Sequence, residues 1–204
     1  MAQPLIQADI QTMSIGRTLL HTRSVEFRGF RRDDGLWDIE GTLRDLRDYD
    51  TLVPEKEVLP AGSPVHHMEV TLTVDDQLEV QSVGTRMQAT PFRSCTEIED
   101  SLRAMIGARM GPGWRHAVNE RLGGTRSCTH LRELVINMAT AALQTIPTWH
   151  AQENKRRGLD PHAGARPHYL GQCHAWRLDG PVVRVHHPRF HQPPSLAGDK
   201  PAKE

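Results

Sequence analysis

The sequence predicts an α+β domain in which an antiparallel β-sheet is packed by two or three α-helices. Two segments in the first half alternate apolar and polar residues, which is typical of half-buried strands joined in hairpins. After about residue 90 the apolar period changes from 2 to 3.6, the period of an amphipathic helix. Strands that precede helices, instead of alternating with them, favour an antiparallel sheet over βαβ units.

The first hairpin joins residues 25–27 to residues 36–43 across a charged turn at 31–35. The second of these segments has a clear apolar face, made of Trp37, Ile39 and Leu43. Three acidic residues are expected on its solvated polar face, namely Asp38, Glu40 and Asp45.

Residues 47–63 are rich in proline and glycine and are expected to form a surface loop. The second hairpin runs from residues 65–74 through a turn at 75–77 to residues 78–83. By alternation, His66 lies on the apolar face of its strand and His67 on the polar face.

Three helical segments and a final hairpin follow. Ser94-Cys95-Thr96-Glu97 has the spacing of a capping box, which predicts the start of a helix. Residues 114–122 predict a short helix, and the longest helix is expected from about residue 128 until Pro147. After a polar segment, residues 173–185 predict a C-terminal hairpin around Asp179-Gly180.

Length and composition limit the domain organisation. The chain has 204 residues, which favours one domain, and a hydrophobic fraction of 37%, below the roughly 45% of an average soluble domain. Part of the chain is therefore expected outside the core. We expect a loose leader at residues 1–15, a single α+β domain at 16–190 and a disordered tail at 191–204.

The charge and the apolar pattern exclude several classes of partner. Lys and Arg number 25 and Asp and Glu number 25, so the chain lacks the broad positive field that drives non-specific nucleic-acid binding. No apolar run approaches the roughly 20 residues of a membrane span, and the N-terminus does not resemble a secretory signal. We therefore expect a cytoplasmic protein that binds neither nucleic acid nor membranes, with its three cysteines free of disulfides.

The cysteines occupy positions suited to chemistry. Cys95 and Cys128 each fall where a helix is expected to begin, and the partial positive charge there stabilises a thiolate. Thiolates bind metals or attack electrophiles, although either thiol can also pack as a small apolar side chain. Cys128 and His130 can share one ion only if Cys128 precedes the first turn, because residues two apart on a helix point about 200° apart.

These side chains supply a candidate metal site and a candidate nucleophile. The candidate ligands of a tetrahedral Cys/His zinc site are His66, His67, Cys95, Cys128 and Cys173. Without metal, Cys128 and His130 form a candidate catalytic thiol–imidazole pair. The sequence contains no GxGxxG, Walker or GxSxG motif, so it does not favour dinucleotide binding, a phosphate-binding loop or serine hydrolysis.

Several segments resemble an uncharacterised bacterial family, domain of unknown function 2889. They are Gly-Phe-Arg-Arg-Asp-Asp-Gly-Leu-Trp-Asp-Ile-Glu-Gly at 29–41, Cys-Thr-His-Leu-Arg-Glu-Leu at 128–134, Cys-His-Ala at 173–175 and Pro-Val-Val at 181–183. The resemblance covers roughly residues 20–190. It implies a compact single domain and no particular activity.

A second, fainter resemblance is to the NifU/SufU iron–sulfur scaffolds. It rests on Pro64-Val65-His66-His67-Met68, on Cys95 and on Arg126-Ser127-Cys128, each at the start of an expected element. It implies that His66 or His67 stands where the first ligand cysteine lies in those proteins, with Cys95 and Cys128 matching the other two. The first ligand cysteine and its Cys-Gly-Asp context are missing from this sequence. Replacement of that cysteine by histidine suits a zinc site better than an iron–sulfur cluster, because zinc binds both imidazole and thiolate.

Together these patterns predict a metal-assisted enzyme, with zinc as the metal, or a thiol-dependent enzyme. Either would act on a small molecule by hydrolytic or lyase chemistry. The alternatives are a non-enzymatic carrier of a metal, iron or an iron–sulfur cluster that docks a protein partner or forms a homo-oligomer, and a metal-free binding module.

Overall fold

The computed structural model describes residues 15–193, which divide into two compact units between Thr145 and Ile146. The expected leader at 1–15 and tail at 191–204 lie outside the described residues, apart from residue 15 and residues 191–193. No helix among the described residues is long and apolar enough to cross a membrane.

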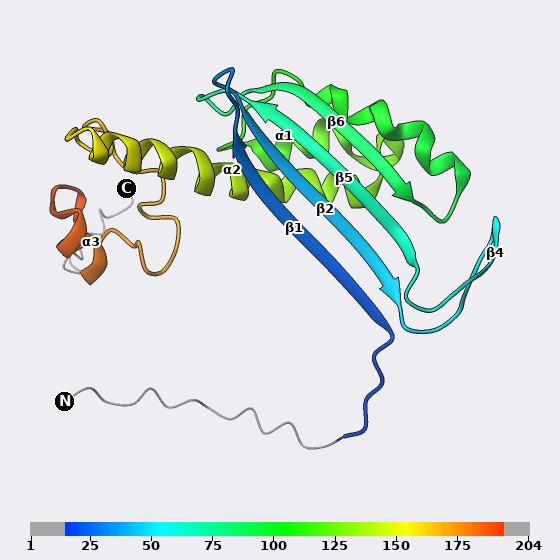
Figure 1. Ribbon diagram of the computed structural model, residues 1–204. Helices are drawn as coiled ribbons and strands as arrows, with labels where there is room; N and C mark the ends of the chain where they lie inside the picture. Colours follow the sequence, from blue (N-terminus) through cyan, green and yellow to red (C-terminus); the bar gives the residue numbers. More distant parts are fainter. Residues whose placement is uncertain (1–14, 194–204) are drawn as a thin grey trace, which may run out of the picture. The chain divides into compact units, whose positions relative to one another are not determined.

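A four-stranded antiparallel sheet is the centre of the first unit (Figure 1). Its strands, in spatial order, are β1 (His21–Arg31), β2 (Trp37–Arg47), β5 (Pro64–Val74) and β6 (Val80–Ala89). Each outer pair is one of the two predicted hairpins, so the predicted antiparallel sheet is confirmed.

The segment between β2 and β5 is more ordered than expected. The predicted surface loop at 47–63 contains a small second sheet made of β3 (Thr51–Val53) and β4 (Lys56–Leu59). Pro54 and Glu55 separate the two strands, and a proline fixes the backbone angle that a tight turn requires. The expectation of irregular structure was therefore wrong for these residues.

The core of the first unit lies on one face of the sheet, as the alternation predicts. The buried apolar side chains of β2 and β5 are Trp37, Ile39, Leu43, Met68, Val70, Leu72 and Val74. Helix α2 (Thr129–Arg156) contributes an apolar stripe in its first part, made of Leu131, Leu134, Val135, Met138 and Ala142. Gly41 of β2 permits the close packing, because a Cβ built there would lie 3.0 Å from the Leu134 side chain.

The shorter helical segments of the first unit are η1 (Arg93–Met105), α1 (Trp114–Leu122) and η2 (Gly124–Arg126). The predicted capping box does not form, since η1 is a 3₁₀ helix whose N-cap residue is Phe92, without a side-chain cap. The helical segment begins at Arg93, so Ser94 lies inside its first turn instead of preceding it.

Two further expectations were wrong because of prolines. Helix α2 does not end at Pro147 but continues to Arg156, since an internal proline removes one intrahelical hydrogen bond without necessarily ending a helix. The C-terminal hairpin is absent from the described residues, where residues 181–186 form α3 (Pro181–His186), followed by η3 (Pro188–Phe190). Pro181 occupies the first turn of α3, a position that suits its fixed backbone angle and missing N–H.

Candidate metal site

Three neighbouring strands place three polar side chains in a row. In the sheet register, Arg23 of β1 is opposite Asp45 of β2, and Asp45 is opposite His66 of β5. Asp45 is only 3% exposed, so its expected place on the solvated face was wrong. It follows Leu43 by two residues and therefore shares the buried face of β2.

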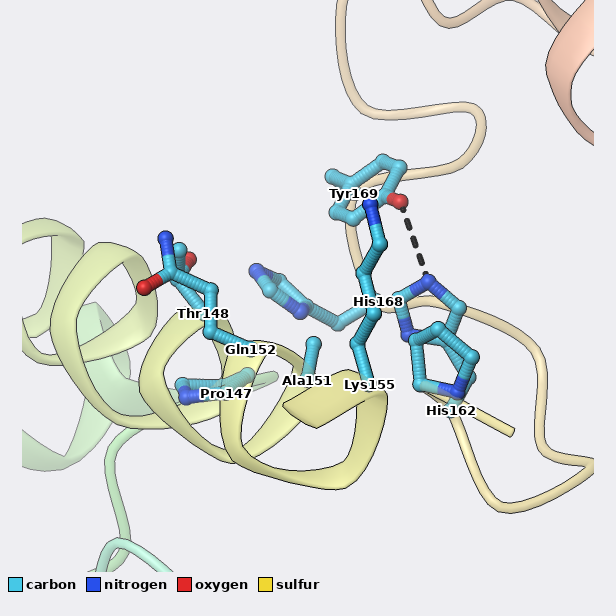
Figure 2. Close-up of a pocket in the computed structure, with 9 residues that line it drawn as sticks. Pro147, Thr148, Ala151, Gln152, Lys155, His162, His168 and Tyr169 are labelled. Atoms are coloured by element: carbon cyan, nitrogen blue, oxygen red, sulfur yellow. Dashed lines mark hydrogen bonds between the residues drawn. The ribbon is translucent and has the colours of Figure 1, made fainter. Parts of the chain in front are cut away.

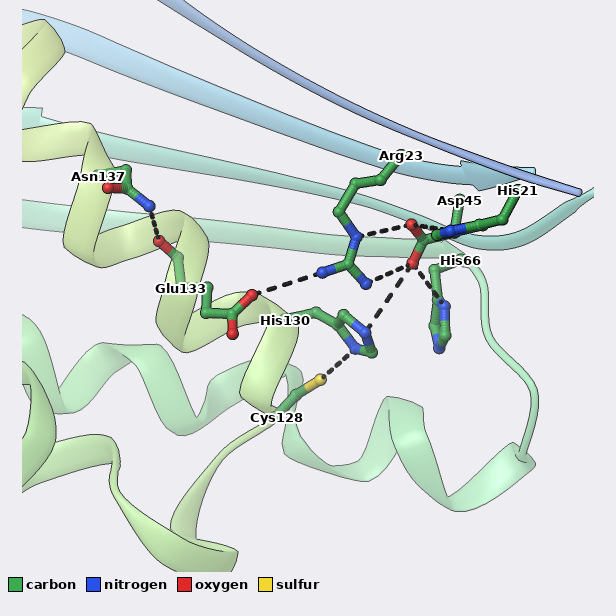
Figure 3. A network of polar contacts seen from close by, with 8 residues as sticks. All are labelled: His21, Arg23, Asp45, His66, Cys128, His130, Glu133 and Asn137. Carbon is green, nitrogen blue, oxygen red and sulfur yellow. Dashed lines mark hydrogen bonds and ion pairs between the residues drawn. The ribbon is translucent and has the colours of Figure 1, made fainter. Parts of the chain in front are cut away.

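The buried carboxylate accepts hydrogen bonds on both oxygens (Figure 3). Arg23 donates from Nε to Oδ1 over 2.7 Å and from Nη2 to Oδ2 over 2.9 Å. His21 Nε2 lies 3.1 Å from Oδ1, and His66 Nδ1 lies 3.0 Å from Oδ2. Burial raises the pKa of Asp45, but the hydrogen bonds and charge of Arg23 outweigh it and lower that pKa to about 2.

A second imidazole reaches the same carboxylate from α2. His130 Nε2 lies 3.9 Å from Asp45 Oδ2, and the rings of His130 and His66 are 4.1 Å apart between centroids. Asp45, His66 and His130 each offer a ligand atom within 4.8 Å of the others. These three residues can therefore hold a metal ion.

The pKa of His66 suits that role. Burial lowers the pKa of this imidazole, and the nearby positive charge of His130 lowers it further, against the opposing effect of Asp45. A metal binds the neutral imidazole, because only that form has a free ring nitrogen lone pair.

Cys128 contacts the other side of the His130 ring. Helix α2 begins at Thr129, so Cys128 precedes the first turn and its Sγ lies 3.5 Å from His130 Nδ1. Burial raises the pKa of the Cys128 thiol, but hydrogen bonds from the His130 ring and from the backbone of Leu131 and His130 give a net lowering. The hydrogen bond with Cys128 in turn raises the pKa of His130. If Nδ1 donates to the sulfur, Nε2 is left facing Asp45.

The other expected site residues lie elsewhere. His67 faces away from the group and lies 3.7 Å from Glu69. Cys95 is half-buried in η1, and Cys173 is exposed in the second unit. None of the three belongs to the Asp45/His66/His130 group. The sequence reasoning missed His21, Arg23 and Asp45 as site residues. For Asp45 a signal was available, because it lies two residues after Leu43 and therefore points to the same, buried face of the strand.

A cavity of about 240 Å³ adjoins the group. The residues that line it are His21, Arg23, Asp45, Arg47, Val65, His66 and His130. Six of these seven side chains are charged or can bind a proton, so the cavity is suited to polar ligands.

The second unit has a cavity of about 240 Å³ of a different kind, beside the C-terminal part of α2 (Figure 2). Tyr169 Oη lies 3.4 Å from His162 Nε2 and 3.0 Å from His187 Nε2. The hydroxyl can donate to one imidazole and accept from the other, so these polar atoms satisfy one another. The first unit therefore holds the stronger candidate site.

Comparison with known proteins identifies a family. A family model described as "Protein of unknown function (DUF2889)" matches residues 21–144, more than half of the chain. The matched region contains the whole four-stranded sheet and the Asp45/His66/His130 group. No curated protein and no solved structure matches, and the expected resemblance to NifU/SufU scaffolds finds no support.

Proposed function

The chain belongs to the DUF2889 family, whose function is unknown, and we propose that it binds a divalent metal ion, zinc, through Asp45, His66 and His130. The observation that carries the proposal is the convergence of these ligand atoms from β2, β5 and α2 within 4.8 Å of one another. Imidazole and carboxylate are common zinc ligands, and a site with three protein ligands keeps a position open, as catalytic zinc sites do.

The spacing of the donor atoms supports the proposal. Zinc bonds of about 2.0–2.1 Å in a tetrahedral site place the ligand atoms roughly 3.3 Å apart. Asp45 Oδ2 lies 3.0 Å from His66 Nδ1 and 3.9 Å from His130 Nε2, so each imidazole lies within about 0.6 Å of that spacing from the carboxylate.

The residues around the group act as supports for the ligands. Arg23 bonds both oxygens of Asp45 and His21 lies beside Oδ1, which fixes the plane of the carboxylate. Cys128 Sγ lies 3.5 Å from His130 Nδ1, and a hydrogen bond from an Nδ1–H to the sulfur would orient the ring with Nε2 toward the group. Such outer contacts set the tautomer and orientation of metal ligands, and their loss typically costs 10- to 100-fold in affinity.

The open position supports an enzymatic role on a small molecule. A bound zinc ion supplies activated water or polarises a carbonyl, which is the chemistry of hydrolytic and lyase reactions. The cavity of about 240 Å³ beside the group gives a small ligand room to approach the ion.

Calorimetric titration of chelator-treated protein with zinc chloride tests the metal proposal. We expect one ion per chain in the wild type, and at least about tenfold weaker binding in Asp45→Asn, His66→Gln and His130→Gln. His67→Gln is the matched control, because His67 neighbours His66 on β5 but faces away from the group. Absence of binding at micromolar zinc, or an equal loss in His67→Gln, would refute the proposal.

Iron is the alternative metal, because two imidazoles and one carboxylate also form the ligand set of non-haem iron(II) sites. Zinc is favoured on affinity, since a given nitrogen and oxygen site binds zinc more tightly than iron(II). An iron–sulfur cluster is not favoured, because cluster ligands are mainly cysteine thiolates and the group contains none. Anaerobic competition of iron(II) against zinc decides between the two ions.

A thiol-dependent enzyme is the second candidate function. The observation in its favour is the 3.5 Å contact between Cys128 Sγ and His130 Nδ1 at the start of α2. In this role the Cys128 thiol gives its proton to His130, the sulfur adds to a carbonyl carbon as the C=O π bond opens, and His130 returns the proton to the leaving group as its bond to that carbon breaks. Cys128→Ser separates the candidates, since it abolishes thiol-dependent turnover but leaves one zinc ion per chain.

A further inference from the structure

The cavity beside the Asp45/His66/His130 group has an excess of positive charge. Two guanidinium groups line it, those of Arg23 and Arg47, against the single carboxylate of Asp45. Arg23 is already paired, since it bonds both oxygens of Asp45 and its Nη1 lies 3.5 Å from Glu133 Oε2. The positive charge of Arg47 is therefore the one left for a ligand.

Arg47 has a neutral partner that holds it in place. Its Nη1 donates to Tyr49 Oη over 2.7 Å, and its guanidinium lies 5.7 Å from the centre of the Tyr49 ring. Among the side chains that the structure describes, no carboxylate lies within 4.0 Å of the Arg47 nitrogens. A guanidinium has five N–H donors, so one bond to Tyr49 leaves most of them for a further acceptor.

The sheet places Arg47 at the same end as the candidate metal ligands. Arg47 is the last residue of β2, two positions beyond Asp45, and is opposite His21 of β1. It lines the cavity together with His66 and His130. A ligand in this cavity can therefore meet Arg47 and the Asp45/His66/His130 group together.

We propose that this cavity binds the oxyanion group of a small molecule, a carboxylate or a phosphate, with Arg47 as its charged hydrogen-bond donor. The inference rests on the proposed function, because a divalent ion at Asp45, His66 and His130 adds to the positive charge that attracts the anion. Arginine recognises carboxylate and phosphate by paired N–H···O bonds, so both sources share this chemistry. The volume of about 240 Å³ has room for such an oxyanion group.

Saturation-transfer NMR on zinc-loaded protein tests the inference, with acetate and methyl phosphate as probes and chloride at matched ionic strength as the blank. We expect at least one probe to bind the wild type, and Arg47→Gln to weaken that binding at least about tenfold, as loss of a charge-assisted hydrogen bond does. Arg44→Gln is the matched control, because Arg44 is an exposed arginine on the opposite face of the same strand. Tighter binding of acetate identifies an organic acid, and tighter binding of methyl phosphate identifies a phosphate ester.

The outcomes for metal and anion are separable. Zinc content is measured by elemental analysis on each variant before the anion titration. Wild-type protein that takes up no zinc refutes the proposed function. Wild-type protein that holds one zinc ion but binds neither probe, or whose binding falls equally in Arg44→Gln and Arg47→Gln, overturns the oxyanion inference alone.

Discussion

Replacing Asp45 by asparagine keeps the size of the side chain but removes the charge that holds Arg23, His21 and His66 together. The pKa of Asp45 lies at about 2 in the folded chain, against an ordinary value of 3.8. At about 1.4 kcal/mol for each pKa unit, this difference corresponds to about 2 kcal/mol of folding free energy. We expect metal-free Asp45→Asn to be less stable than the wild type by about that amount at pH 7.

The pH dependence follows from the direction of the shift. A lowered carboxyl pKa stabilises the folded state fully above the unfolded value of 3.8, and the stabilisation is lost as the pH falls through the folded value of about 2. At pH 3 about half of the difference between wild type and Asp45→Asn should remain. Below pH 2 the protonated aspartic acid is neutral like asparagine, so the two proteins should converge.

Urea unfolding of chelator-treated protein measures this difference. The fluorescence of Trp37 and Trp114, which are buried in the first unit, monitors the unfolding. Glu40→Gln is the matched control on the same strand, because Glu40 lies on the opposite face of β2 and takes part in none of the bonds between Asp45 and Arg23, His21 or His66. A difference between wild type and Asp45→Asn that does not change between pH 7 and pH 3 would refute the assigned pKa and the role of the Arg23 bond.

Two further predictions concern the packing of α2 and the thiol at its start. Gly29→Ala should destabilise the protein by about 1–3 kcal/mol in urea unfolding, because the added Cβ would overlap the Thr145 side chain. Gly84→Ala is the control and should change stability by less than about 0.5 kcal/mol, since its Cβ meets only Thr71 at 3.8 Å. Equal effects of the two substitutions would contradict the packing of Gly29 against Thr145. The second prediction concerns metal-free protein in which the other cysteines are replaced by alanine. The rate of Cys128 alkylation should reach half its maximum below pH 9.0, and His130→Gln should move that midpoint to higher pH. A midpoint that does not change in His130→Gln would contradict the Cys128–His130 hydrogen bond.

Local patterns in the sequence were sufficient to predict the sheet. The alternation around Ile39 and around Val70 places these side chains in the core, as the structure confirms. Prolines were harder to interpret, because Pro147 lies inside a helix and Pro181 begins one. A proline restricts its own backbone, but the surrounding packing decides whether the helix ends there.

The candidate site depends on contacts that no local pattern specifies. Asp45 and His66 meet because β2 pairs directly with β5, although β3 and β4 lie between them in the sequence, and the sequence does not determine that register. Cys128 contacts His130 only because α2 begins at Thr129, and helix boundaries are the least reliable part of a sequence-based prediction. The positions of Cys95 and Cys128 at expected helix starts predicted cysteine ligands, whereas the candidate metal group consists of two imidazoles and a carboxylate.

Anomalous diffraction at the zinc edge, from crystals of protein loaded with one equivalent of zinc, tests the central claim most directly. The proposal predicts one strong peak, bonded by Asp45, His66 and His130, with no cysteine sulfur among its ligands. A peak held by the thiolates of Cys95, Cys128 or Cys173, or no peak between Asp45 and the two imidazoles, would contradict it.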